Sequence, residues 1–361
     1  MKKSTKRFCA MIMAAATMMA CVLSGCSKTP VSSAETGNPP AETEKTENLD
    51  NSAESSAKAY PSMQIDMACN NTNSPDESLL LKFGELVEER SGGQIKAVVF
   101  SGTLGSELEI VEQIRSGTVH MYVSATPTIS TYAAEYNTFS VPYVYSDEEQ
   151  VMKSWKGSIG EGLRANYEAA DLYTSADTLF IRGMRELTSN KIVKTVEDVR
   201  GLKLRLPSTA EWVTVWSKMG ANVATISSSE VFSALQTGVV DAQENPIISN
   251  YNKGLQEVQK YTIMTDHIVD LLPVVYSKKW FDGLDADTQE LIRECLDEAT
   301  VWANGYSIDL TESNQKEMEA AGMEFIEVDT SSFKEVALSC LEELSKNWAD
   351  GIYDQLMEDI K

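Results

Sequence analysis

The sequence predicts an α/β protein of two lobes joined by a hinge, with a long helix near the C-terminus that braces both lobes. Three observations predict this class. Strand and helix patterns alternate in two separate stretches, 63–123 and 202–243, in the manner of βαβ units. A long helical pattern begins after Asp285. The chain of 361 residues is long enough for two compact domains behind an N-terminal segment.

Residues 1–25 have the features of a signal peptide. Four basic side chains precede an apolar run at 8–23, which has the length of a signal-peptide core and is too short to span a bilayer. The run ends in Leu-Ser-Gly-Cys, which resembles the bacterial lipobox, so we expect Cys26 to carry a lipid anchor. The alternative is an ordinary secretory signal in which this cysteine is incidental.

The tether and the lobes follow in order. Residues 26–59 are mainly Ser, Thr, Glu, Ala, Asn and Pro, a composition that predicts a flexible tether because it offers little apolar surface to bury. We assign 60–183 mainly to lobe 1 and 184–272 mainly to lobe 2. Residues 273–361 are assigned to a hinge or crossover strand and the C-terminal helices.

Charge and cysteine content limit the partners. The net charge of −23 argues against nucleic acid and anionic lipid as partners, and an anionic ligand would need a locally positive site. Cys69, Cys295 and Cys340 lie in the predicted folded part. We expect them to be buried free thiols, with a bridge between Cys295 and Cys340 as the alternative. Because no Cys/His spacing suits zinc, we expect no metal site.

Helix caps divide lobe 1 into elements. Ser74 with Glu77 forms a capping box with proline at the first helical position, and Ser106 with Glu109 opens a second helix that ends at Gly117. The predicted elements are a strand at 63–68, a helix from Pro75 to before Gly92, a strand at 95–100, a helix from 107 to 115 and a strand at 119–123.

Lobe 2 repeats this organisation. Residues 230–243 echo residues 109–122, with Gly238 aligned to Gly117, so the lobes are either related or share an ordinary helix-to-strand turn by coincidence. Ligands in such folds lie at the carboxyl ends of the strands, which in two lobes can face one cleft. The predicted elements are strands at 202–206, 221–225 and 239–243 and helices at 209–219 and 229–236.

The C-terminal part is predicted to be helical. Asp285 caps a helix whose apolar stripe extends through Leu291, Leu296 and Trp302, and which can exceed thirty residues. A strand at 323–327 and one helix over 333–344 follow, and then a short acidic helix. We interpret the apolar stripes as core packing.

Short motifs in a fixed order carry a family resemblance. Together they resemble the solute-binding proteins of tripartite ATP-independent periplasmic (TRAP) transporters, of the DctP type. The resemblance implies a periplasmic-binding-protein-like fold, a monomer, and delivery of a small organic acid to the membrane subunits of a transporter. The motifs are Leu-Gly-Ser-Glu at 104–107, Val-Pro-Tyr at 141–143, Gly-Met-Arg at 183–185, Thr-Val-Glu-Asp at 195–198, Gly-Leu-Lys-Leu-Arg-Leu-Pro at 201–207 and Gln-Glu-Asn-Pro at 243–246.

The resemblance also implies which residues bind the ligand. Arg205 would form a two-pronged salt bridge to a carboxylate, whose plane matches the parallel donors of guanidinium. Arg185 would be a second arginine near the cleft, or an ion-pair partner between the lobes. Asn245 would contact the ligand, or serve only as a turn residue. Of the two tryptophans that follow Arg205, we expect Trp212 to line the pocket and Trp216 to be buried.

Two residues of lobe 1 complete the predicted site. Asn70 and Glu107 match positions that meet ligand hydroxyl groups in some members of the family, with loop and helix-cap roles as the alternative. The stretch at 124–128 lacks the charged groups of sialic-acid-binding members. The resemblance therefore favours a C4-dicarboxylate or a sugar acid such as a uronate.

We expect a binding protein without enzymatic activity or cofactor. The chain has two histidines, and no GxSxG, HExxH or phosphate-loop pattern occurs. Its predicted location is the outer face of the cell membrane. An alternative in another class is a binding protein that presents the acid to a sensory receptor.

Overall fold

The computed structural model describes residues 59–361. The predicted signal peptide, the anchor cysteine Cys26 and the tether up to residue 58 lie outside the described residues. Within this part of the chain, no helix combines the length and hydropathy needed to cross a membrane.

The first sheet has the strand order β2-β1-β3-β11-β4. Parallel strands β1 (Met63–Cys69), β2 (Ile95–Ser101) and β3 (Met121–Val123) confirm the three predictions, although the third begins two residues later than expected. Strands β11 (Val274–Ser277) and β4 (Leu172–Thr174) extend the sheet in antiparallel pairing. The sheet therefore incorporates a strand from near the C-terminal third of the chain.

The helices of the first lobe begin and end where their caps predict. Ser74 accepts a hydrogen bond from the backbone of Glu77 at the start of α1 (Pro75–Arg90). A capping box opens α2 (Glu107–Ser116), and Gly117 ends it with φ 79°, a left-handed conformation that glycine adopts without strain. Three further helices complete this part: α3 (Thr126–Tyr132), α4 (Glu148–Lys156) and α5 (Ser158–Ala169).

The second sheet has the order β12-β9-β5-β8-β6-β7. The predicted helices at 209–219 and 229–236 are confirmed as α6 and α7, the latter after a short 3₁₀ turn. The elements of this lobe are β5 (Phe180–Ser189), β6 (Lys203–Leu206), α6 (Ala210–Lys218), β7 (Asn222–Thr225), α7 (Val231–Gln236), β8 (Ala242–Pro246), α8 (Ile247–Asn252), β9 (Tyr261–Met264) and β12 (Glu324–Glu327).

Strand β8 corrects one prediction. It begins at Ala242, three residues after the expected start, and Val239 remains 59% exposed. Antiparallel pairing with β5 extends the strand to Pro246, which lies opposite Arg185. The strand therefore includes the whole Gln-Glu-Asn-Pro motif instead of ending at its first residue.

Two strands connect the sheets. β5 pairs through its second half with β8 and β9, and through its first half with β10 (Val269–Leu272). β10 leads past Pro273 directly into β11 of the first sheet. The chain thus passes between the lobes twice, at β5 and at β10, and these two strands lie side by side. Such a pair of adjacent crossings can form a hinge.

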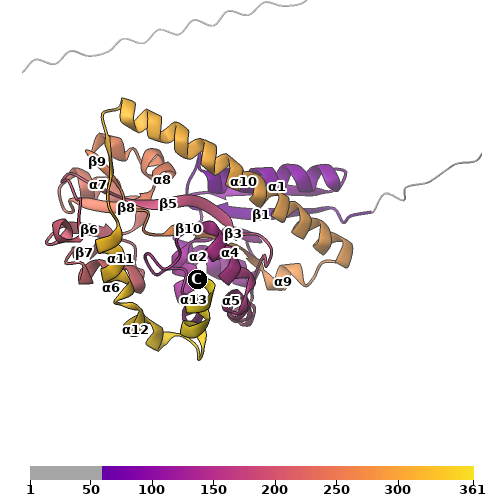
Figure 1. The fold of residues 1–361 in the computed structure, drawn as a ribbon. Helices are drawn as coiled ribbons and strands as arrows, with labels where there is room; N and C mark the ends of the chain where they lie inside the picture. Colours follow the sequence, from indigo (N-terminus) through magenta and orange to yellow (C-terminus); the bar gives the residue numbers. More distant parts are fainter. Residues whose placement is uncertain (1–58) are drawn as a thin grey trace, which may run out of the picture. The chain divides into compact units, whose positions relative to one another are not determined.

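The predicted bracing helix is confirmed. Asp285 caps α10 (Ala286–Ala320), which is 35 residues long. This helix packs against α1 of the first lobe, against β5, and against α8 of the second lobe, and Figure 1 shows it in orange across both. The α/β class, the two sheets and the long helix are therefore as expected.

The C-terminal segment differs from its prediction. The expected single helix at 333–344 is wrong, because the chain forms α11 (Ser331–Leu338) and α12 (Leu341–Leu344). At the break between these two helices, the Ser339 hydroxyl and the Cys340 thiol both donate hydrogen bonds to the Val336 carbonyl. Such side-chain hydrogen bonds compete with the backbone hydrogen bonds that would continue the helix. Helices α9 (Lys278–Phe281) and α13 (Ile352–Asp359) complete the described chain.

The cysteines are free and buried. This holds for Cys69, Cys295 and Cys340, so the alternative of a bridge between the last two is wrong. Burial raises the pKa of Cys69 to about 12 and that of Cys295 to about 11. Both thiols therefore remain protonated at neutral pH and pack as small apolar side chains.

Candidate ligand-binding site

The predicted binding residues lie near the carboxyl ends of strands from both sheets. Asn70 directly follows β1, and Arg205 is the third residue of the four-residue β6. Asn245 lies one residue before the end of β8, and Glu107 opens α2. In open α/β sheets this edge forms the binding crevice.

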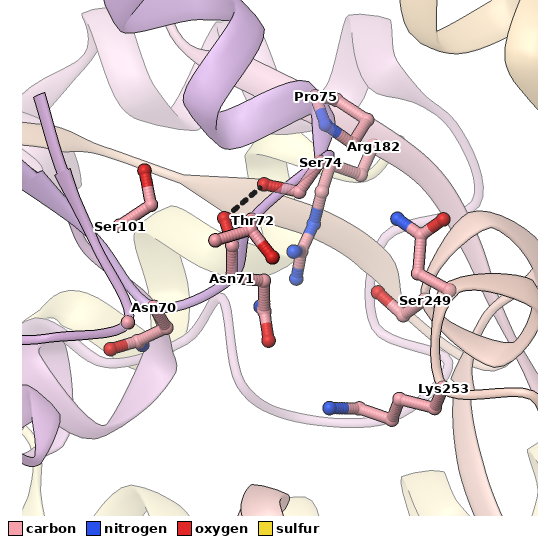
Figure 2. A pocket seen from close by; sticks show the side chains of 11 residues that line it. Asn70, Asn71, Thr72, Ser74, Pro75, Ser101, Arg182, Ser249 and Lys253 are labelled. Atoms are coloured by element: carbon pink, nitrogen blue, oxygen red, sulfur yellow. Dashed lines mark hydrogen bonds between the residues drawn. The ribbon is translucent and has the colours of Figure 1, made fainter. Parts of the chain in front are cut away.

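A polar cavity of about 310 Å³ lies between the two lobes. That volume is at the small end of the range for ligand pockets. Figure 2 shows lobe-1 side chains on one side, Ser249 and Lys253 opposite them, and Arg182 between the two sides. The lobe-1 lining is Asn70, Asn71, Thr72, Ser74, Pro75, Ser101 and Gly102, and the remaining lining residue is Asn252.

Arg205 is a buried cation that has no carboxylate partner within residues 59–361. Only 3% of its surface is exposed. Its Nε donates to the backbone oxygen of Ile226 at 2.8 Å, and its two terminal nitrogens hydrogen-bond no other residue in 59–361. Burial lowers the pKa of Arg205 to about 10, so it remains positively charged at neutral pH. Because a buried charge without a counter-ion is costly, an anion that reaches it would be bound strongly.

Arg185 has the opposite environment. It is 5% exposed, and its guanidinium forms ion pairs with Glu244 at 2.6 Å and with Asp270 at 2.6 Å. It also donates to the side-chain oxygen of Asn245 at 3.0 Å. Although burial opposes the charge, Glu244 and Asp270 raise the pKa of Arg185. Arg185 is therefore held in ion pairs, as one alternative expected, but these pairs lie within the second lobe and not between the lobes.

Arg182 connects the lobes through a buried ion-pair network. Its guanidinium contacts Asp76 on α1 at 3.1 Å and Asp270 on β10 at 2.8 Å. Asp270 also pairs with Arg185, which in turn pairs with Glu244. Burial acts to raise the pKa of Asp270, but the two arginines outweigh it and lower that pKa. Arg182 is not among the predicted binding residues, yet it lies on the cavity wall.

A network of buried amides positions Asn245. Its side-chain nitrogen donates to Gln243 at 2.5 Å, while its side-chain oxygen accepts from Arg185. Gln243 donates in turn to Asn250, whose nitrogen returns to the backbone oxygen of Asn245. The motif Gln-Glu-Asn-Pro therefore supplies an ordered polar wall beside Arg185.

Both tryptophans of α6 are buried. Trp216 is 1% exposed, as predicted, and its ring packs edge-on against His267. Trp212 is 2% exposed, and the Arg185 guanidinium lies over its ring at 4.6 Å. Neither indole nitrogen hydrogen-bonds another described residue. Trp212 therefore holds an unused donor next to Arg185 but is absent from the lining of the cavity of about 310 Å³.

The two lobe-1 candidates have different surroundings. Asn70 is exposed, lines the cavity and donates to the Tyr122 hydroxyl at 2.6 Å. Glu107 accepts hydrogen bonds from the backbone of Ala125 and from the backbone and hydroxyl of Thr128, which are at the start of α3. Burial raises the pKa of Glu107 against these hydrogen bonds. Its contacts match the helix-cap alternative.

The sequence analysis missed Lys253. It follows α8, where a lysine at a helix C-terminus is ordinary. Its ammonium donates to the Ser228 hydroxyl at 2.8 Å and forms no ion pair with another residue of the described chain. Burial, together with the charges of Arg205 and Arg182, lowers the pKa of Lys253 to about 8. Lys253 and Arg205 thus form a positive region in an acidic protein.

The two-lobed α/β fold with a polar interlobe cavity defines a solute-binding protein of the periplasmic-binding type. The chain matches the family "Bacterial extracellular solute-binding protein, family 7" (DctP) over residues 68–347, and it belongs to this family. It is a solute-binding protein of the TRAP transporter class.

Relatives and solved structures agree with this assignment. The 2,3-diketo-L-gulonate-binding periplasmic protein YiaO of Escherichia coli is 30% identical over 70% of this chain and 78% of that protein. The solute-binding protein of Pseudomonas putida with bound D-glucuronate is 28% identical, with TM-score 0.75 over 81% of this chain and 96% of the other. That of Roseobacter denitrificans with bound L-galactonate is 26% identical, with TM-score 0.76 over 84% and 100%.

Proposed function

We propose that this protein captures a small organic acid, a sugar acid or a C4-dicarboxylate, and delivers it to the membrane subunits of a TRAP transporter. The observation that carries the proposal is Arg205, buried to 97% and free of carboxylate partners among residues 59–361. Its two terminal nitrogens are the parallel donors that a ligand carboxylate needs. The ligand supplies the missing counter-ion.

The neighbouring residues hold this clamp and add donors. Arg185 is already ion-paired with Glu244 and Asp270. In the proposal it therefore orients Asn245 and Trp212 and makes no direct contact with the ligand. The indole nitrogen of Trp212 is available to donate to the bound acid. On the other lobe, Asn70 faces the cavity and Glu107 orders the start of α3.

Capture proceeds by closure of the lobes about β5 and β10. The acid first meets Arg205 on lobe 2, and groups of lobe 1 then complete its surroundings, so binding favours the closed arrangement. The proteins of similar sequence or structure whose names give a ligand include those for 2,3-diketo-L-gulonate, D-glucuronate and L-galactonate. These relatives support a sugar acid as the ligand of this chain. In the proposal the protein itself performs no reaction and needs no cofactor.

The N-terminal segment supplies the location. A lipid on Cys26 would hold the protein at the membrane, and residues 27–58 would let the folded part reach the transporter. Fractionation of cells that express the wild type and Cys26→Ser tests this: wild type should sediment with membranes and the variant should not. Equal distribution of both would contradict the anchor.

The carboxylate clamp is tested by calorimetry. We expect wild-type protein to bind at least one of D-glucuronate, D-galacturonate, L-galactonate, succinate and malate, and Arg205→Met to weaken that binding about 100-fold or more, because a charged, desolvated pair is lost. The exposed Arg200→Met serves as control and should bind like wild type. Unchanged affinity in Arg205→Met, or binding of none of these acids by the wild type, would contradict the clamp.

A further inference from the structure

A second cation, Lys253, lines the cavity close to Arg205, which itself lies behind the lining. Arg205 and Lys253 are held by the same segment, since Arg205 Nε donates to the Ile226 oxygen at 2.8 Å and Lys253 Nζ donates to the Ser228 hydroxyl at 2.8 Å. The two cations therefore lie close together although they come from β6 and from the end of α8. Neither has a carboxylate partner within residues 59–361.

The charges around Lys253 come from three elements. Arg205 on β6 and Arg182 and Arg185 on β5 lower the pKa of Lys253, and Asp76 on α1 is the acidic group that raises it. Asp76 itself is occupied by Arg182, with both side-chain oxygens at 3.1 Å. Lys253 is thus a cation that is repelled by neighbouring cations, and a second negative charge on the ligand would offset this repulsion.

Polar side chains on both sides of the cavity are suited to hydroxyl groups. Asn71, Thr72 and Ser249 line the same cavity, and their side chains hydrogen-bond no other residue of the described chain. Figure 2 shows Asn71 and Lys253 extending into the open centre from opposite sides. An apolar C4 chain would leave these groups unpaired, whereas a hydroxylated carbon chain would pair them.

We propose that Lys253 binds a second acid group of the ligand, so that the preferred substrate class is a hydroxylated dicarboxylate, such as a sugar acid oxidised at both ends. This inference rests on the proposed function, because it requires the first carboxylate at Arg205. Asn71, Thr72 and Ser249 bind the hydroxyl groups between the two acids. Lys253 is then the residue that distinguishes a diacid from a monoacid of the same length.

Paired ligands test the inference by calorimetry on the full chain at pH 7. Galactarate is compared with galactonate, and glucarate with gluconate, since the two open-chain acids of each pair differ only in one terminal acid group. Wild type should bind the diacids about 10-fold or more tighter. Lys253→Met should weaken diacid binding about 10- to 100-fold and change monoacid binding less than about 3-fold, as expected for one charged hydrogen bond. The exposed Lys156→Met is the matched control and should bind both like wild type.

The dependence on pH gives a second readout. Because Lys253 must be charged to bind the second acid, the diacid preference of wild type should decline as the pH rises above about 8. Lys253→Arg should keep its preference at pH 9, because guanidinium stays protonated there. A merely structural lysine would not give this difference.

The outcomes separate the two proposals. If acids bind through Arg205 but the wild type treats diacid and monoacid alike, or Lys253→Met weakens both equally, the Lys253 inference is overturned and the proposed function stands. If no acid binds, or Arg205→Met binds like wild type, the proposed function fails whatever Lys253 does.

Discussion

Arg185 and Arg205 lie on the two strands that flank β8, both almost fully buried, yet their surroundings are opposite. Arg185 on β5 is neutralised by Glu244 and Asp270, whereas Arg205 on β6 meets only a backbone oxygen in the part of the chain that the structure describes. A paired buried arginine is part of the fold. An unpaired one is a cost to the fold, and this cost points to a ligand that offsets it.

The largest expected effect is on stability, when the paired arginine is removed. Arg185→Met should lower the free energy of unfolding by about 3–5 kcal/mol, because Glu244 loses its cation and Asp270 retains only Arg182 in the interior. Urea unfolding of the ligand-free protein at pH 7 measures this change. A loss below about 1 kcal/mol would show that these carboxylates are stabilised by other means.

Arg205→Met is the matched comparison and should shift stability in the other direction. The lowered pKa of Arg205 means that the folded state disfavours its charge relative to the unfolded chain, a penalty present at every pH below about 10. Replacing it should raise the unfolding free energy at pH 7. Destabilisation by both variants to the same degree would remove the contrast between the two arginines.

Sequence predicted the elements whose signals are local. The Ser74 cap predicted the start of α1 and Gly117 predicted the end of α2 to within a residue or two. Both signals are local, because a cap or a left-handed glycine acts on its own helix end. The helix over 333–344 was predicted in one piece because its apolar spacing continues through the break. Strand β5 received no prediction, since its buried Arg182, Arg185 and Glu186 look like surface residues until their partners are known.

The candidate site shows the same limit. The motif around Arg205 directed attention to this residue through a family resemblance, but its lack of a partner depends on strands far apart in the chain. Lys253 had no distinguishing local signal, because Asn-Lys-Gly after a helix is an ordinary ending. Its placement near Arg205 depends on long-range contacts, since Lys253 hydrogen-bonds Ser228 while Arg205 hydrogen-bonds Ile226 of the same segment.

Two buried glutamates show the same contrast between a paired and an unpaired charge, and a smaller effect on stability is expected for them. Glu244 is paired with Arg185, whereas Glu186, 1% exposed, has no cation partner within residues 59–361 and accepts from the backbone of Asp266 at 2.9 Å. Burial and the charge of Asp266 raise the pKa of Glu186 well above its usual value. A raised pKa means that the native state loses stability as the pH rises above the ordinary value of about 4.5.

Glu186→Gln should therefore raise the unfolding free energy at pH 8 by about 1 kcal/mol, equivalent to about 2–4 °C in midpoint, and leave it unchanged near pH 4. Thermal unfolding at pH 4, 6 and 8 measures the difference. The exposed Glu335→Gln is the control and should show no such trend. A uniform shift at all three pH values would indicate an effect of packing and not of titration.

The smallest effect separates the two tryptophans of α6. Trp212→Phe keeps an aromatic ring beneath Arg185 but removes the indole donor, which has no partner in residues 59–361. Because that donor contributes no hydrogen bond to the ligand-free fold, stability should change little, whereas affinity for the acid should fall about 5-fold, the value of one hydrogen bond of about 1 kcal/mol. Trp216→Phe removes an equally buried and unpartnered donor beside His267 and should leave affinity unchanged. Equal losses of affinity in both variants would mean that α6 acts through packing alone, and that Trp212 does not donate to the ligand.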